Sequence, residues 1–128
     1  MGLTPIRLLL FAMIVLALQY GWKHMPHPGA GGSPTAEALR SIASTVQPGE
    51  VTMYSTTECA YCAQARAWLT QYGFAFTECN MSLDPRCEQE FLAYGATGTP
   101  YLVIRRGGRT YHMKDGFDSE EFLRVLKG

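Results

Sequence analysis

Two of the four cysteines in this chain form the motif Cys59-Ala60-Tyr61-Cys62. The β-branched and aromatic residues just before it, 51–55, predict a buried strand, and the motif then opens a helix. A thiol at a helix N-terminus lies among free backbone N–H groups, which favour the thiolate; such thiols have pKa values lowered to roughly 3.5–7.5. We expect Cys59 to attack a disulfide and Cys62, about one helical turn later, to resolve the mixed disulfide.

The motif has two other interpretations, half of a zinc site and a structural disulfide. Zinc takes four ligands, and the remaining cysteines, Cys79 and Cys87, do not form a second C-x-x-C. We therefore interpret Cys59 and Cys62 as a redox-active disulfide that requires no metal and no organic cofactor. The eleven basic and eleven acidic side chains of the chain balance, so its charge gives no reason to expect a nucleic-acid partner.

The N-terminal segment is strongly apolar. Residues 8–18 are uninterrupted by a polar side chain and follow Arg7, which is typical of a secretory signal peptide. Gln19 stands where a cleavage site would have a small residue, so we favour an uncleaved signal-anchor in residues 1–22 over cleavage. Residues 3–22 are just long enough to span a bilayer, which needs about 20 residues. We expect a membrane-anchored protein with its domain on the periplasmic or another extracytoplasmic side.

Residues 23–34 are rich in proline and glycine and predict a linker. Residues 35–128 have the composition of a compact domain. Apolar spacing and turn residues predict its elements in the order helix, strand, helix, strand, helix, two-stranded hairpin, helix. The expected strands and helices are a helix within 34–47, a strand over 51–55, a helix from the motif to Tyr72, a strand over 74–79, a helix over 85–94, a hairpin over 101–113 and a helix after Asp118. This order is typical of an α/β fold with a mixed four-stranded sheet flanked by helices.

Several motifs in the domain, taken together, resemble those of one known protein family. They are Tyr54-Ser55, Cys59-Ala-Tyr-Cys62, Arg66, Thr97-Gly-Thr-Pro100 and Gly116-Phe117-Asp118. Together they resemble the glutaredoxins of the thioredoxin superfamily, over about residues 35–128. The resemblance implies a thioredoxin-like fold and a thiol–disulfide oxidoreductase in which Cys59 is the nucleophile and Cys62 the resolving thiol. It also implies a cis-proline loop, Thr99-Pro100, that faces the two cysteines.

The resemblance also implies a substrate-binding surface. Its candidate residues are Tyr61, Thr99, Pro100, Gly116, Phe117 and Asp118. Two departures bear on glutathione: Thr56 stands where glutaredoxins that bind glutathione usually have a lysine, and Glu58 would raise the pKa of Cys59 and oppose a carboxylate. Glutathione is therefore a candidate co-substrate. The expected partners are protein disulfides or glutathione-like thiols, and we expect the chain to be a monomer.

Cys79 and Cys87 form a second pair. They lie at the end of a predicted strand and in the first turn of the next helix, so their Cα atoms could approach within the 4.4–6.8 Å, roughly, that a disulfide needs. Two buried free thiols are the alternative. With an export signal and an even cysteine count, we expect a structural disulfide.

Two other functions stay open at this stage. Paired domains could hold an iron–sulfur cluster or a metal between their Cys59 thiolates, as some glutaredoxins do with glutathione. Alternatively, the domain is redox-silent and only docks a partner. The direction of electron flow depends on the reduction potential, which the motif does not fix.

Overall fold

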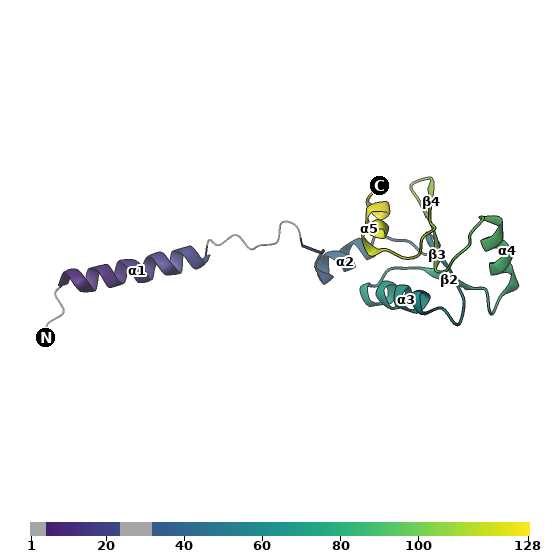
Figure 1. Ribbon diagram of the computed structural model, residues 1–128. Coiled ribbons are helices and arrows are strands. Elements are labelled where there is room, and N and C mark those ends of the chain that lie inside the picture. The colour runs from purple at the N-terminus through teal and green to yellow at the C-terminus, as the bar shows by residue number, and fades with distance from the viewer. Residues whose placement is uncertain (1–4, 24–31) are drawn as a thin grey trace. The chain divides into compact units, whose positions relative to one another are not determined.

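The computed structural model describes residues 5–23 and 32–128, and the chain divides into two units, Met1–Ser33 and Pro34–Gly128 (Figure 1). The helices and strands are α1 (Pro5–Lys23), α2 (Ala36–Ala43), β1 (Val51–Ser55), α3 (Ala60–Tyr72), β2 (Thr77–Asn80), α4 (Pro85–Ala93), β3 (Tyr101–Arg106), β4 (Arg109–Met113) and α5 (Ser119–Lys127). Most of the predicted linker, residues 24–31, lies outside the described residues.

The first unit contains α1. Within the described ranges, no helix is both long enough and apolar enough to cross a membrane. The structure therefore does not support the prediction that residues 3–22 span a bilayer.

The second unit is built on the predicted mixed sheet of four strands, in the order β2-β1-β3-β4. β1 pairs with β2 in parallel, as a helical connection between them requires, and β3 is antiparallel to both β1 and β4. This is the thioredoxin-like α/β arrangement that the sequence predicts. It places β1, which leads into the cysteine motif, in the interior of the sheet.

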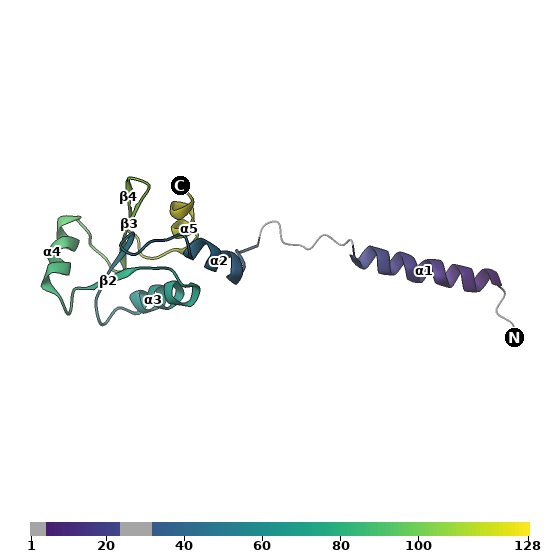
Figure 2. The same ribbon diagram turned by 180° about the vertical axis from the view of Figure 1, so that it is seen from behind.

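Alternating side chains of the inner strands enter two separate cores, because successive residues of a strand point to opposite faces. Met53 and Leu102 face α2, α3 and α5 in the larger core. Tyr54 and Tyr101 face α4 in the smaller core, which includes Cys87. In both views α4 lies at the end of the domain away from α2 (Figures 1 and 2).

One predicted strand begins later than expected. The sequence predicts a strand over 74–79, but β2 starts at Thr77. Gly73 adopts the left-handed conformation (φ 77°) that ends α3, and the Phe74 N–H then donates to the Leu69 carbonyl. Phe74 therefore turns back onto α3 and is buried there instead of joining the sheet.

Candidate active site

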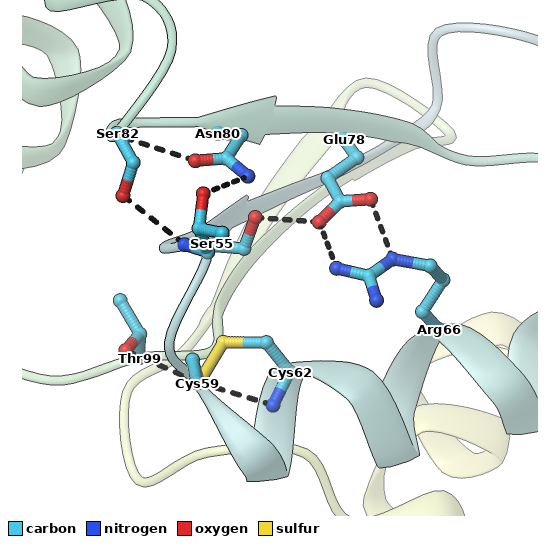
Figure 3. The surroundings of a disulfide bond; sticks show 9 residues. Ser55, Cys59, Cys62, Arg66, Glu78, Asn80, Ser82 and Thr99 are labelled. Carbon is cyan, nitrogen blue, oxygen red and sulfur yellow. Dashed lines mark hydrogen bonds and ion pairs between the residues drawn. A yellow bond between two sulfur atoms is a disulfide. The ribbon is translucent and has the colours of Figure 1, made fainter.

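The two motif cysteines occupy the start of α3, directly after the turn that follows β1. Cys59 is the N-cap residue of α3 and Cys62 lies in its first turn, so the sequence prediction of their placement agrees with the structure. They form a disulfide with their Cα atoms 5.2 Å apart (Figure 3). Cys62 is fully buried whereas Cys59 is half-buried. An incoming sulfur therefore reaches Cys59 more easily than Cys62.

Hydrogen-bond donors converge on the sulfur of Cys59. The backbone N–H of Cys62 donates to Sγ at 3.1 Å, and the hydroxyl of Thr99 lies 3.5 Å from the same atom. The first turn of α3 contains no acidic residue, but the exposed Glu58 directly precedes Cys59 and opposes negative charge at this helix end. After reduction of the disulfide, these donors are in place to stabilise a thiolate on Cys59.

The loop that carries Thr99 faces the motif. The Thr99–Pro100 peptide bond is cis, as the sequence resemblance implies, and the Pro100 side chain is almost fully buried. Figure 3 shows Thr99 directed toward the Cys59 end of the disulfide rather than the Cys62 end.

A cleft of about 670 Å³ lies between α3, the cis-proline loop and the segment before α5; its lining includes Tyr61 of the motif and Thr99 but neither cysteine. It brings together all six candidate substrate-binding residues: Tyr61, Thr99, Pro100, Gly116, Phe117 and Asp118. Gly116 has a positive φ of 97°, a conformation that L side chains rarely adopt. The carboxylate of Asp118 accepts the Glu121 N–H at 2.7 Å and so caps α5. The binding role of these residues remains a prediction.

The cleft also contains residues that the sequence analysis did not single out, among them Gln64, Trp68 and Lys114. Trp68 stacks on Phe74 with ring centroids 5.2 Å apart and contacts Phe117 at 5.3 Å, which makes one wall of the cleft aromatic. Gln64 and Trp68 follow Tyr61 at intervals of three and seven residues. Helical spacing would therefore have placed them on the same face of α3.

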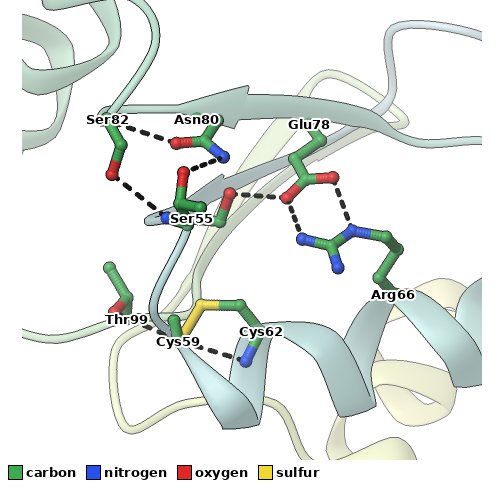
Figure 4. Close-up of polar contacts among 9 residues, drawn as sticks. Ser55, Cys59, Cys62, Arg66, Glu78, Asn80, Ser82 and Thr99 are labelled. Atoms are coloured by element: carbon green, nitrogen blue, oxygen red, sulfur yellow. Dashed lines mark hydrogen bonds and ion pairs between the residues drawn. A yellow bond between two sulfur atoms is a disulfide. The ribbon is translucent and has the colours of Figure 1, made fainter.

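An ion pair lies beside the motif and connects α3 to β2. Arg66 donates two hydrogen bonds to the carboxylate of Glu78, and the buried Ser55 hydroxyl donates a third at 2.6 Å (Figure 4). The hydrogen bonds from Arg66 are the main cause that lowers the pKa of Glu78, and the bond from Ser55 adds to it. Glu78 is therefore an anion at neutral pH, and its charge is balanced by Arg66. No local sequence pattern indicated this contact, because the partners belong to different elements.

A second disulfide joins Cys79 of β2 to Cys87 of α4, with Cα atoms 5.4 Å apart. Cys87 is buried in the smaller core, next to Phe91. Across residues 5–23 and 32–128, the structure shows no group of three or more His, Cys, Asp or Glu side chains arranged to hold a metal.

Comparisons with known proteins agree with this geometry. The glutaredoxin family model matches residues 51–108, which run from β1 through the motif to the β3–β4 turn. A mutant of the thioredoxin-like protein BC3987 is 22% identical, with a TM-score of 0.52 over 62% of this chain and 96% of that one. No curated protein matches the chain.

Glutaredoxins are also among the similar solved structures. The holo form of glutaredoxin C1 from Populus tremula x tremuloides is 24% identical over 72% of this chain and 94% of that one, with a TM-score of 0.46. The glutaredoxin from Archaeoglobus fulgidus is 20% identical over 77% of this chain and all (100%) of that one, with a TM-score of 0.48. The fold is thioredoxin-like, and residues 51–108 are similar to the glutaredoxin family.

Proposed function

We propose that this chain is a glutaredoxin-like thiol–disulfide oxidoreductase that reacts through Cys59 and Cys62. The observation that carries the proposal is the asymmetry of the pair: Cys59 is the more accessible residue and its sulfur faces the Cys62 N–H and the Thr99 hydroxyl. These donors favour negative charge on Cys59 once the pair is reduced. Cys62 is buried behind it, so we expect it to attack Cys59 Sγ of a mixed disulfide rather than a free substrate disulfide.

The reaction follows from this arrangement. The Cys59 thiolate attacks one sulfur of a substrate disulfide, forms a mixed disulfide with it and releases the other sulfur as a thiolate. Cys62 then loses its proton and attacks Cys59 Sγ, which forms the Cys59–Cys62 disulfide and releases the second substrate thiolate. Two electrons pass to the substrate. In reverse, the Cys59–Cys62 disulfide oxidises a dithiol, and the reduction potential of the pair decides the direction.

The cleft supports a thiol-containing substrate with a peptide backbone, such as a protein disulfide or a glutathione-like thiol. Thr99 and Pro100 lie at its edge beside Cys59, and Trp68 and Phe117 supply apolar surface. Glutathione stays a candidate co-substrate of this site. Thr56 brings no positive charge to the approach and Glu58 is exposed next to the nucleophile, so we expect neutral or basic peptide disulfides to react faster than anionic ones.

The Cys79–Cys87 disulfide supports a site of action in an oxidising, extracytoplasmic compartment, because structural disulfides persist there and are rare in the cytosol. The redox-active pair gives no such indication, since catalytic disulfides also occur in reducing compartments. Mass spectrometry of the chain from its natural host, with free thiols blocked at lysis, would show whether Cys79 and Cys87 are bonded there. Free thiols at both positions would remove this argument.

Trapping of mixed disulfides tests the assigned roles. Cys62→Ser removes the resolving thiol, so the variant should accumulate mixed disulfides through Cys59 when a peptide disulfide is added. Cys59→Ser should accumulate none. Equal trapping by both variants would refute the assignment, and trapping by neither, together with a visible absorption band in the fresh wild-type protein, would favour a cluster-binding domain instead.

A further inference from the structure

The turn that leads into Cys59 is tied to the loop between β2 and α4. The backbone N–H of Thr57 donates to Ser82 Oγ at 3.1 Å, and the side-chain amide of Asn80 donates to Thr57 Oγ1 at 3.4 Å. Thr57 is thus held through both its backbone and its side chain. In the described part of the chain, the hydrogen bonds that connect residues 56–58 to another element come from Asn80 and Ser82.

The loop that supplies these bonds is itself fixed. Asn80 Oδ1 accepts the Ser82 N–H at 2.9 Å, so the amide group of Asn80 bridges the loop and the turn. The Asn80 carbonyl accepts the N–H groups of Leu83 and Asp84, and the Met81 N–H donates to the Ser55 carbonyl at 2.8 Å. These bonds hold the loop against the end of β1.

The second disulfide encloses this loop. Cys79 directly precedes Asn80, and Cys87 lies in the first turn of α4, so the bond between them closes residues 80–86 into a ring. β2 is an edge strand whose one neighbour in the sheet is β1. The sheet therefore supports the end of β2 from one side, and the disulfide supplies a second attachment through α4.

We propose that Asn80 and Ser82 are positioning residues for Cys59 and that the Cys79–Cys87 disulfide fixes the loop that presents them. The inference rests on the proposed function, because its consequence is the reactivity of the nucleophile. Cys59 receives the Cys62 N–H in the extended backbone conformation of an N-cap residue (φ −106°, ψ 104°). Cys59 comes two residues after Thr57, at the end of the same turn, so the position of Thr57 affects the backbone conformation of Cys59.

The consequence is electrostatic. Hydrogen bonds weaken steeply when the donor and acceptor lose their alignment, and bonds to an ionised acceptor lose the most. When the turn is free to move, the Cys59 thiolate spends less time aligned with the Cys62 N–H and the Thr99 hydroxyl. Its protonated form gains relative to the thiolate. The sequence alone predicts that the Cys79–Cys87 disulfide affects the stability of the domain. The hydrogen bonds of Asn80 and Ser82 to Thr57 connect this disulfide to the nucleophile Cys59.

Alkylation of Cys59 over a range of pH tests the proposal in the full chain. The Cys62→Ser background, with Cys79 and Cys87 oxidised, leaves Cys59 as the free thiol, and mass spectrometry follows its reaction with iodoacetamide. Ser82→Ala and Asn80→Ala should each raise the pH midpoint of alkylation by about 0.5 unit, which slows the reaction about threefold below the midpoint. Replacing Cys79 and Cys87 together by alanine should shift the midpoint in the same direction.

Leu83→Ala is the matched control. Leu83 belongs to the same loop but its side chain is 78% exposed, so its loss should leave the midpoint unchanged. Unchanged midpoints in Ser82→Ala and Asn80→Ala would overturn the positioning role. An unchanged midpoint in the double cysteine variant alone would overturn the role of the disulfide.

A second measurement, amide hydrogen exchange, uses the wild-type chain and so does not depend on whether a variant folds. Hydrogen exchange at the Thr57 amide of the wild-type chain should be protected, because that N–H donates to Ser82. Exchange at the rate of an unstructured amide would also overturn the proposal. Alkylation and exchange require no turnover, so they separate this inference from the proposed function: a chain that lacks disulfide exchange but shows the shifts retains the positioning role and loses the enzymatic one.

Discussion

Removal of the Cys79–Cys87 disulfide should destabilise the domain by an amount that the loop length sets. The two cysteines are separated by 8 positions in the sequence. The entropy of closing a loop of that length in the unfolded chain corresponds to about 2.5 kcal/mol at 25 °C. For a domain of this size, that is a fall in melting temperature of about 10–20 °C. Cys87 is also buried in the smaller core, so alanine at this position removes packing contacts in addition.

Denaturation by urea measures the effect most cleanly in a background with Cys59→Ser and Cys62→Ser. Cys79–Cys87 is then the one disulfide of the chain that a reductant opens. Reduction keeps both sulfur atoms in place, so the loss of unfolding free energy on reduction reports the cross-link alone. The further loss on replacing both cysteines by alanine reports the packing of Cys87.

We expect the loss on reduction to be about 2.5 kcal/mol and the alanine variant to be insensitive to reductant. A loss below about 0.5 kcal/mol on reduction would refute the reasoning. It would mean that the bond does not form in the folded chain, or that the unfolded chain already keeps residues 79 and 87 together. Thiol counting under denaturing conditions distinguishes the two cases.

Three further substitutions test other contacts. The pKa of Glu78 is lowered mainly by the hydrogen bonds from Arg66. The contribution of the Glu78 carboxylate to the free energy of unfolding is therefore complete above about pH 5 and is lost as the pH falls through the folded-state pKa. Glu78→Gln should lower the free energy of unfolding by about 1 kcal/mol at pH 7 and flatten its dependence on pH on the acid side, measured by urea denaturation. Tyr54→Phe removes a hydroxyl that donates to a carboxylate on α4 at 2.7 Å and should cost about 1 kcal/mol in the same assay, whereas an unchanged value would show that this bond adds nothing over water. Thr99→Val removes one donor to Cys59 and should slow its alkylation near pH 6 about threefold; an unchanged rate would show that the hydroxyl does not reach the thiolate.

The sequence predicts those parts of the fold that depend on local signals. Asp84 and Pro85 predict the start of α4, and Asp118 predicts the start of α5, because capping residues act within one turn. The strand expected over 74–79 was placed too early. Apolar character alone suggested a strand at Phe74, whereas the reversal of the chain at Gly73 directs that side chain onto α3.

The features of the candidate site likewise fall into those that local sequence signals predict and those that they do not. The cysteine motif can be predicted because its residues are contiguous, whereas the cis-proline loop is implied by the resemblance to glutaredoxins. Trp68 could have been found from helical spacing after Tyr61. The contact of Arg66 with Glu78 could not be predicted. It depends on the register between β1 and β2, which brings a residue of β2 beside α3. The bonds of Asn80 and Ser82 to Thr57 have the same origin.

The central claim, that Cys59 and Cys62 exchange disulfides reversibly, is tested most directly by the reduction potential of this pair. In the full wild-type chain equilibrated in glutathione buffers, blocking of free thiols followed by mass spectrometry of the peptides measures Cys59–Cys62 separately from Cys79–Cys87. We predict a single reversible two-electron transition between about −120 mV, which would indicate an oxidant, and about −270 mV, which would indicate a reductant that needs an electron supply. A pair that forms no disulfide anywhere in this range, in a chain that is folded, would contradict the proposal.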